Sequence, residues 1–418
     1  MEEAMAYADS VGATVWLLVS ASLVLLMTPA LAFFYGGMSR SKSVLNMMMM
    51  SFGAMAVVTV AWVVVGNSLS TGSNSAGGLV GSPSSDWFFS STFASHDAQT
   101  IIGAGFGATF AIITVALISG SIADRTKFSA WLVFAGLWAV LVYAPVSHWV
   151  WGGGILSQSG PIFSSSWFPQ DFAGGTVVHI NAGVAGLVLA LLLGVRKGFG
   201  KEPFKPHNLP FVMLGAALLW FGWFGFNAGS AFAADASATA AWVNTTAATA
   251  AAILGWLAVE KVRDGKATSL GAASGVVAGL VAITPAAVAV DPWGALLIGA
   301  GAGVLSALAV GLKYRFGYDD SLDVVGVHLV AGLWGTLAIG LFGTTTFGAW
   351  EGLFVGGGFA GLAAQAVAAA VSIVYCALAT LVIGLVIKRT MGLRVSEHVE
   401  VTGIDLAEHG ETAYEEAL

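Results

Sequence analysis

The chain has 418 residues and a formal net charge of −7, and 57% of its residues are hydrophobic while only 9% are charged. A water-soluble domain ordinarily carries about 25% charged residues, so this composition excludes one and predicts an all-α integral membrane protein. The single cysteine, Cys376, excludes an intramolecular disulfide. The acidic start of the chain does not resemble a secretory signal, so we expect the first apolar segment to be retained.

Eleven apolar segments follow one another along the chain, most of them near the length of about 20 residues that a helix needs to cross a bilayer. The ten-residue alternation that is typical of membrane β-barrels is absent. We therefore predict eleven transmembrane helices. They are expected at residues 14–35, 44–66, 99–123, 128–150, 173–195, 210–233, 240–259, 268–288, 294–312, 322–343 and 354–387.

The positive charges test this number of segments. All 16 Lys and Arg residues fall in groups that follow odd-numbered segments, and none follows an even-numbered one. Because positive loops stay on the cytoplasmic side, the N-terminus is predicted outside and the C-terminus inside the cell. The groups lie at residues 40–42, 125–127, 196–205, 261–266, 313–315 and 388–394.

Two predicted helices carry a histidine in the same local pattern. Asp171 stands eight residues before His179, and Asp320 stands eight residues before His328. Glycines follow each histidine four and seven residues later. The first helix starts from the outer face and the second from the inner face, so at 1.5 Å per residue each histidine reaches about 12 Å inward, close to the midplane.

This arrangement predicts two five-helix inverted repeats, at about 12–197 and 208–345, followed by an eleventh helix at about 354–388. The transmembrane domain then covers residues 1–395, and residues 396–418 form a cytoplasmic tail. The tail is acidic, so we expect it to be solvated, with a regulatory contact as the alternative.

A buried imidazole without a partner costs roughly 2 to 7 kcal/mol, so His179 and His328 are expected to hydrogen-bond to each other. Each alone could be a satisfied core residue. Two imidazoles without nearby Cys or carboxylate ligands make a poor zinc site. A membrane redox enzyme with a haem between the histidines is a further alternative, but the small-residue packing argues against the cavity that it needs.

Five distinctive motifs lie at residues 33–42, 149–154, 171–179, 204–210 and 222–230. They resemble the Amt/Mep/Rh ammonium transporter family, and specifically its Amt branch. The resemblance covers nearly the whole chain. It implies an eleven-span inverted-repeat fold, a homotrimer with a pore through each protomer, and a place in the cell membrane. It implies no enzymatic activity, cofactor, metal or nucleic-acid partner.

The resemblance also implies roles for single residues. Trp151 and Phe106 would present aromatic faces to a cation at the outer surface, and Ser230 would accept a hydrogen bond from it. Phe110 and Phe226 would form a gate below that site. Taken alone, Trp151 could equally be an interfacial anchor, and the other aromatic residues could be core residues.

Asp171 is expected at the first turn of its helix, where a carboxylate can cap free backbone N–H groups. The resemblance marks it as necessary for conduction, and we interpret it as a structural support rather than a ligand.

The resulting hypothesis is an ammonium transporter or ammonia channel. Ammonium or methylammonium would be recruited outside and deprotonated, and ammonia would pass His179 and His328 with separate transfer of the proton. The alternative is an ammonium-sensing receptor that signals through its cytoplasmic face. In either case the resemblance implies a possible PII-type regulatory protein at that face.

Overall fold

The computed structural model describes residues 2–163 and 166–414, so the predicted tail is described except for 415–418. Eleven helices among these residues are long and apolar enough to cross a bilayer, and this matches the number predicted from the sequence. They are Asp9–Met38, Val44–Thr71, Ala98–Ile122, Phe128–Val150, Gly175–Leu193, Leu209–Gly229, Ala236–Asp264, Ser269–Ala286, Pro292–Phe316, Val325–Phe342 and Ala360–Thr390.

Most of the described chain is helical. The α-helices are α1 (Glu2–Met38), α2 (Val44–Ala61), α3 (Asn67–Thr71), α4 (Ser90–Ala94), α5 (Ala98–Ile118), α6 (Phe128–Trp138), α7 (Ala144–Val150), α8 (Asn181–Leu193), α9 (Leu209–Gly229), α10 (Ala236–Asp264), α11 (Ser269–Ile283), α12 (Pro292–Ala309), α13 (Leu312–Phe316), α14 (Val330–Phe342), α15 (Ala360–Thr390) and α16 (Glu397–Thr402).

Shorter elements complete the spans and loops. The π-helical segments are η1 (Trp62–Gly66), η4 (Ala139–Tyr143), η5 (Gly175–Ile180), η7 (Val325–Leu329) and η9 (Asp405–His409). The 3-10 helices are η2 (Trp87–Phe89), η3 (Ser119–Ile122), η6 (Thr284–Ala286) and η8 (Leu353–Val355). Two short strands, β1 (Asn74–Ser75) and β2 (Val80–Gly81), pair antiparallel, with Asn74 opposite Gly81 and Ser75 opposite Val80.

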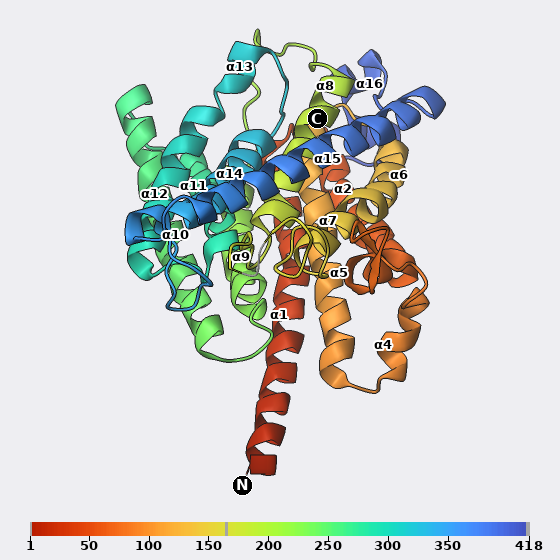
Figure 1. Cartoon of the computed structure of the whole chain (residues 1–418). Coiled ribbons are helices and arrows are strands. Elements are labelled where there is room, and N and C mark those ends of the chain that lie inside the picture. Colours follow the sequence, from red (N-terminus) through yellow and green to blue (C-terminus); the bar gives the residue numbers. More distant parts are fainter. Residues whose placement is uncertain (1, 164–165, 415–418) are drawn as a thin grey trace.

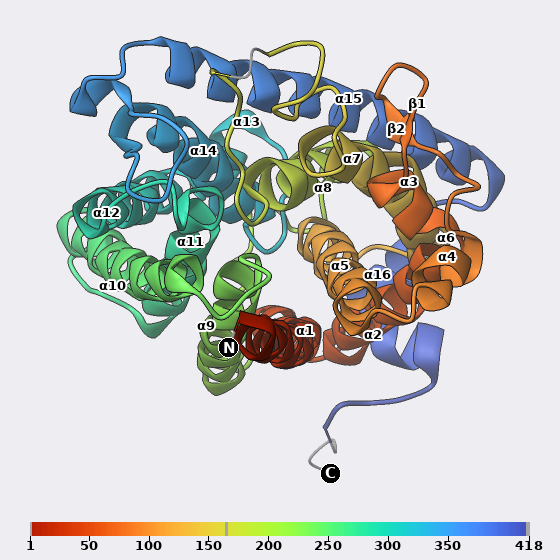
Figure 2. The same ribbon diagram turned by 60° about the horizontal axis from the view of Figure 1, so that its bottom comes forward.

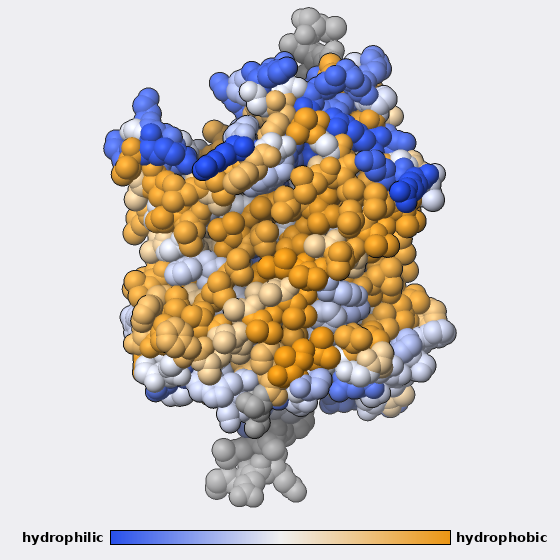
Figure 3. Space-filling model, turned by 45° about the horizontal axis from the view of Figure 1, so that its top comes forward, coloured by the Kyte–Doolittle hydropathy of each residue, from blue (hydrophilic) through white to orange (hydrophobic). Residues whose placement is uncertain are grey.

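The start of α1 and the helix α16 lie at opposite ends of the molecule (Figure 1). We call these ends the N-terminal face and the C-terminal face. Hydrophobic side chains form a broad band between them, and hydrophilic side chains gather at the ends (Figure 3). Because the spans alternate in direction, every group of Lys and Arg lies at or just after the end of a span that ends at the C-terminal face.

Helices from distant parts of the chain pack side by side. In the view toward the N-terminal face, α1 lies beside α9, and α10, α11 and α12 form a cluster next to them (Figure 2). The long helix α15 runs along the edge of the molecule and contacts α14, α8 and α6. The helices α5, α8, α9 and α11 therefore surround the centre, where the candidate site lies.

Glycine makes several close helix contacts possible. A Cβ atom on Gly299 would lie 2.0 Å from the Ala248 carbonyl oxygen, and one on Gly303 would lie 2.1 Å from that of Ala252. Both contacts join α12 to α10. Small residues at such positions let helix backbones approach in a bilayer, where packing rather than water release drives association.

Polar side chains define several helix starts. The Asp97 carboxylate caps α5 by accepting a hydrogen bond from the Thr100 N–H, and Asn208 caps α9 in the same way. Asp235 and Thr268 cap α10 and α11. These residues satisfy N–H groups that have no partner within the helix.

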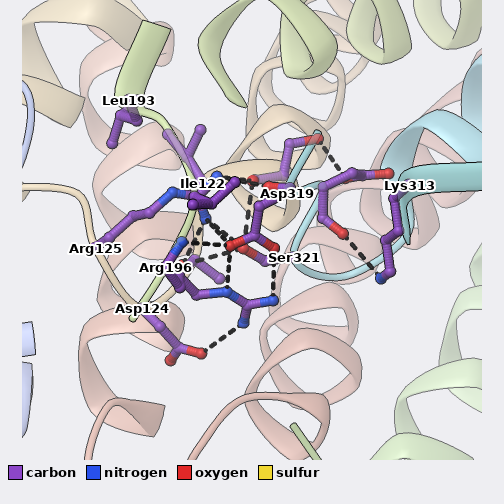
Figure 4. A network of polar contacts seen from close by, with 12 residues as sticks. Ile122, Asp124, Arg125, Leu193, Arg196, Lys313, Asp319 and Ser321 are labelled. Atoms are coloured by element: carbon purple, nitrogen blue, oxygen red, sulfur yellow. Dashed lines mark hydrogen bonds and ion pairs between the residues drawn. The ribbon is translucent and has the colours of Figure 1, made fainter. Parts of the chain in front are cut away.

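Buried ion pairs tie loops together at the C-terminal face (Figure 4). The Arg196 guanidinium contacts Asp319 at 2.8 Å and Asp124 at 3.1 Å. Arg125 is fully buried and donates to the Asp319 carbonyl oxygen and to the Ser321 hydroxyl. Burial alone raises the pKa of Asp319, but hydrogen bonds from Arg196 and the charges of Arg196 and Arg125 outweigh it and lower the pKa.

Part of the acidic tail is docked rather than solvated, so the expectation of a solvated tail is wrong for two of its carboxylates. Glu400 is 1% exposed and pairs with Arg394 at 2.7 Å. Asp405 is 2% exposed and accepts hydrogen bonds from the backbone N–H groups of Leu45 and Asn46 at the start of α2. A carboxylate is favoured there because it faces the positive end of the helix dipole.

We predict that Asp319→Ala destabilises the protein by about 3 to 5 kcal/mol, because it leaves Arg196 and Arg125 buried without the carboxylate that both of them contact. Thermal unfolding in detergent measures this loss of stability. The matched control is Asp264→Ala, which removes a carboxylate from the exposed pair with Arg263 and should change the unfolding temperature little. Equal effects of the two substitutions would contradict the structural role of Asp319. Because the pKa of Asp319 is lowered in the folded protein, the stability that its carboxylate contributes should be lost as pH falls through that lowered pKa.

Candidate functional site

A cavity of about 960 Å³ opens at the N-terminal face, between the ends of α5, α7 and α9. Five residues singled out in the sequence line it, namely Phe106, Phe110, Trp151, Asp171 and Ser230. The three others, Phe226, His179 and His328, do not line the cavity and lie deeper in the bundle.

Aromatic rings form one wall of the cavity. Phe106 and Phe110 stand four residues apart on α5, so they share a helix face, and their ring centroids are 4.8 Å apart. Trp151 is 39% exposed and meets Phe110 edge to face at 6.1 Å. Its indole Nε1–H donates to the Asp171 carbonyl oxygen at 2.7 Å. The π-faces of these rings can attract a small cation.

Ser230 lies at the end of α9, on the same cavity. Its hydroxyl donates a hydrogen bond to the Phe226 carbonyl oxygen at 2.8 Å. That bond uses the only hydrogen of the hydroxyl and leaves both lone pairs of Oγ for an incoming donor. The hydroxyl is therefore set to accept hydrogen bonds in the cavity.

Phe110 and Phe226 stack face to face at the inner end of the cavity. Their ring centroids are 4.0 Å apart with an angle of 13° between the rings. Phe110 is 3% exposed and Phe226 is fully buried. The stacked pair separates the cavity from the histidines, because the Phe226 ring lies 6.2 Å from the His179 ring.

His179 and His328 contact each other in the buried interior. Their Nδ1 atoms are 3.4 Å apart, so one ring can donate and the other accept. The His179 Nε2 atom has no hydrogen-bond partner among the described residues. The histidines lie on η5 and η7, the π-helical starts of two spans. Such irregular segments are frequent at functional sites. No group of three or more His, Cys, Asp or Glu residues in the described ranges could hold a metal ion.

The two aspartates of the repeated pattern cap these irregular starts. Asp171 accepts hydrogen bonds from four successive backbone N–H groups, those of residues 174–177, at 2.7 to 3.3 Å. Asp320 accepts from Val324 and Val325 and from the Ser121 hydroxyl. Burial raises the pKa of Asp171, and its four N–H donors counter part of that shift because they favour the carboxylate. These contacts agree with the interpretation of Asp171 as a residue that stabilises the start of the helix.

Two residues near the site were missed in the sequence. Trp223 stacks on His179 with ring centroids 5.4 Å apart. Its position three residues before Phe226 on α9 is the signal that could have indicated it. His148, on α7 next to the cavity, hydrogen-bonds to the backbone of Ser70 and to the side chain of Asn74. No local pattern marks His148, because both partners lie more than 70 residues away in the chain.

Eleven apolar helices around a solute-sized cavity define a multi-pass membrane protein of the kind that transports small molecules. The chain belongs to the Ammonium Transporter Family, whose family model matches residues 15–414. It is 55% identical to an ammonium transporter of Mycobacterium tuberculosis over 434 aligned residues, which cover 97% of this chain and 91% of that protein.

Solved structures of related proteins have the same fold. The crystal structure of Saccharomyces cerevisiae Mep2 superposes with a TM-score of 0.86 at 32% identity, covering 97% of this chain and 92% of that one. A structure titled as a sensor Amt protein superposes with a TM-score of 0.87 at 26% identity, covering 98% and 100%. These similarities support ammonium transport as the function of the chain.

We predict that Asp171→Ala lowers the free energy of unfolding by roughly 3 kcal/mol, because four buried N–H groups lose a charged acceptor. Asp171→Asn should cost less, since its single amide oxygen keeps part of the hydrogen bonding. Asp97→Ala is the matched control, because Asp97 also caps a helix but is exposed. Thermal unfolding in detergent compares the three. A variant Asp171→Ala as stable as Asp97→Ala would contradict the capping role.

Proposed function

We propose that the chain conducts ammonia derived from external ammonium across the cell membrane, through a pore that passes His179 and His328. The observation that carries the proposal is the continuous series of rings from the cavity inward. Phe110 lines the cavity and stacks on Phe226, Phe226 contacts His179, and His179 contacts His328.

The proposed orientation places the N-terminal face outside the cell and the C-terminal face in the cytoplasm. Its support is the distribution of Lys and Arg, all of which lie at or just after the ends of spans at the C-terminal face. The cavity is then an outer vestibule. The two inverted repeats, the boundary of the transmembrane domain at residue 395 and the tail that follows it belong to the same proposal. The matching caps of Asp171 and Asp320 at spans entered from opposite faces support the repeats.

In the first step, the vestibule would hold ammonium between aromatic faces and a hydroxyl. Trp151 and Phe106 would contribute cation–π attraction, worth about 0.5 to 2 kcal/mol according to how much water is removed. Ser230 would accept an N–H of the ion through its free lone pairs. Potassium has a similar charge and size, but it has no proton to donate to Ser230.

In the second step, ammonium would lose a proton before ammonia passes Phe110 and Phe226. Both rings are buried and stacked, so their fluctuation would open the path as a gate. A bare cation in an apolar passage loses its hydration at a large free-energy cost, whereas neutral ammonia loses far less. Selectivity against potassium would follow. The proton would either cross separately along the histidine pair or remain outside.

The family resemblance further leads us to propose a homotrimer and a PII-type regulatory partner at the cytoplasmic face. A second candidate function is that of an ammonium-sensing receptor. Two observations favour it, the docked tail at Glu400 and Asp405 and the similarity to a structure titled as a sensor Amt protein. Uptake of labelled methylammonium by a transport-deficient host separates the two, because a pure receptor senses ammonium without uptake.

The central prediction concerns proteoliposomes on a solid-supported membrane. An ammonium gradient should drive uptake, and an equal potassium gradient should not. Charge movement that depends on ammonium would support separate proton transfer, and uptake without current would support an ammonia channel. Equal responses to ammonium and potassium would overturn the proposed selectivity.

A second prediction tests the histidine pair. The double variant His179→Ala, His328→Ala should lose discrimination against potassium, because water can enter the widened passage and hydrate the ion. The control is His398→Ala, which removes an exposed histidine from the tail. A double variant that still excludes potassium as the wild type does would remove the pair from the selectivity mechanism.

A further inference from the structure

We propose that His148 is a positioning residue for Trp151, and that it acts as an imidazolium that donates hydrogen bonds from both ring nitrogens. The inference rests on the proposed function, in which Trp151 helps to hold the transported cation. It concerns the wall of the vestibule and not the buried histidine pair.

The first ring nitrogen faces an atom that can only accept. The His148 Nδ1 atom lies 3.0 Å from the Ser70 carbonyl oxygen. A carbonyl oxygen has no hydrogen to donate, so Nδ1 must carry the proton of this hydrogen bond.

The second ring nitrogen faces the side chain of Asn74. The His148 Nε2 atom lies 2.8 Å from Asn74 Oδ1, while Asn74 Nδ2 donates to the Gly153 carbonyl oxygen at 3.0 Å. A flipped amide would point its oxygen at the Gly153 carbonyl oxygen, and two acceptors would then face each other. The amide orientation is therefore set by Gly153. Nε2 must also donate, and the ring is positively charged.

The described elements that pack most closely on α7 carry no Lys or Arg side chain. These elements are α3, β2, η4 and η5, and the titratable side chains within them are Tyr143 and His179. Tyr375 of α15 contacts the neighbouring Trp149, and Asp171 in the following loop receives the Trp151 Nε1–H on its carbonyl oxygen. The two neutral oxygens of Ser70 and Asn74 are thus the direct partners of the charge.

His148 connects two segments of the vestibule wall. One is the hairpin segment, residues 67–81, which contains α3, β1 and β2. The other is the Trp151 turn, residues 151–154, whose Gly152 and Gly154 N–H groups donate to the His148 carbonyl oxygen. The turn presses closely on the ring, since a Cβ atom on Gly152 would lie 2.5 Å from His148 Nδ1.

Loss of one proton from the ring disturbs this connection. If Nε2 is deprotonated, it becomes an acceptor facing the Asn74 oxygen at 2.8 Å. Either that contact becomes repulsive or the amide flips and its bond to Gly153 is lost. In both cases one of the bonds between the hairpin segment and the Trp151 turn is weakened, and the indole is less well placed for the cation.

The transport test follows methylammonium uptake into proteoliposomes between about pH 5 and 8, where a histidine ordinarily changes its charge. We expect KM to rise about fivefold with pH, the equivalent of one hydrogen bond, with little change in maximal rate. His148→Gln should abolish this pH dependence. Asn74→Asp, at an exposed position, should keep KM low over this range because a carboxylate oxygen is a stronger acceptor for the ring N–H. The control His96→Gln removes an exposed histidine of an N-terminal-face loop and should keep the wild-type profile.

The charge state itself is read by ¹⁵N NMR of histidine-labelled protein in lipid bilayers, with the His148 signals assigned by their loss in His148→Gln. Two protonated ring nitrogens at pH 6 are expected. One unprotonated nitrogen, or a wild-type KM that does not vary with pH, would overturn the inference. Two protonated nitrogens in a protein that transports no methylammonium would instead count against the proposed function.

Discussion

The hydrocarbon layer of a bilayer offers no hydrogen-bond partner to a charge or to a free peptide group, and the rest of this structure depends on that constraint. Regular helices satisfy their own backbone and can cross the layer. Charged side chains gather at the two ends of the molecule, and those that are buried are hydrogen-bonded or ion-paired, as Arg196 is with Asp319 and Asp124. The hydrophobic band between the two faces is the visible result (Figure 3).

The same constraint explains the form of the candidate site. An irregular helix start at membrane depth must have its N–H groups satisfied by some other group, and Asp171 and Asp320 serve this purpose at η5 and η7. Each irregular start carries a histidine, and the two imidazoles meet in the buried interior. The aspartates of the repeated pattern thus accept hydrogen bonds from free backbone N–H groups, and its histidines contact each other through their Nδ1 atoms.

Much of the fold could be predicted because span length and charge placement are local properties of the sequence. Eleven apolar segments and the positions of the Lys and Arg groups were sufficient to count the spans. The contact of His179 with His328 was also predictable, since the depth of a residue in a straight helix follows from its distance to the helix start. The stacking of Phe226 on Phe110 was expected only from the family resemblance, because nothing in either segment indicates which helices are neighbours.

The sequence by itself determined that the chain crosses a membrane, how often, and which two histidines enter the interior. These properties depend on the free energy of transfer of each segment, which is a sum over its own residues. Only the tertiary structure decided that Glu400 and Asp405 are docked and that His148 joins the hairpin segment to the Trp151 turn. The partners of Asp405 lie about 360 residues away, and such pairings arise from the packing of the complete helix bundle.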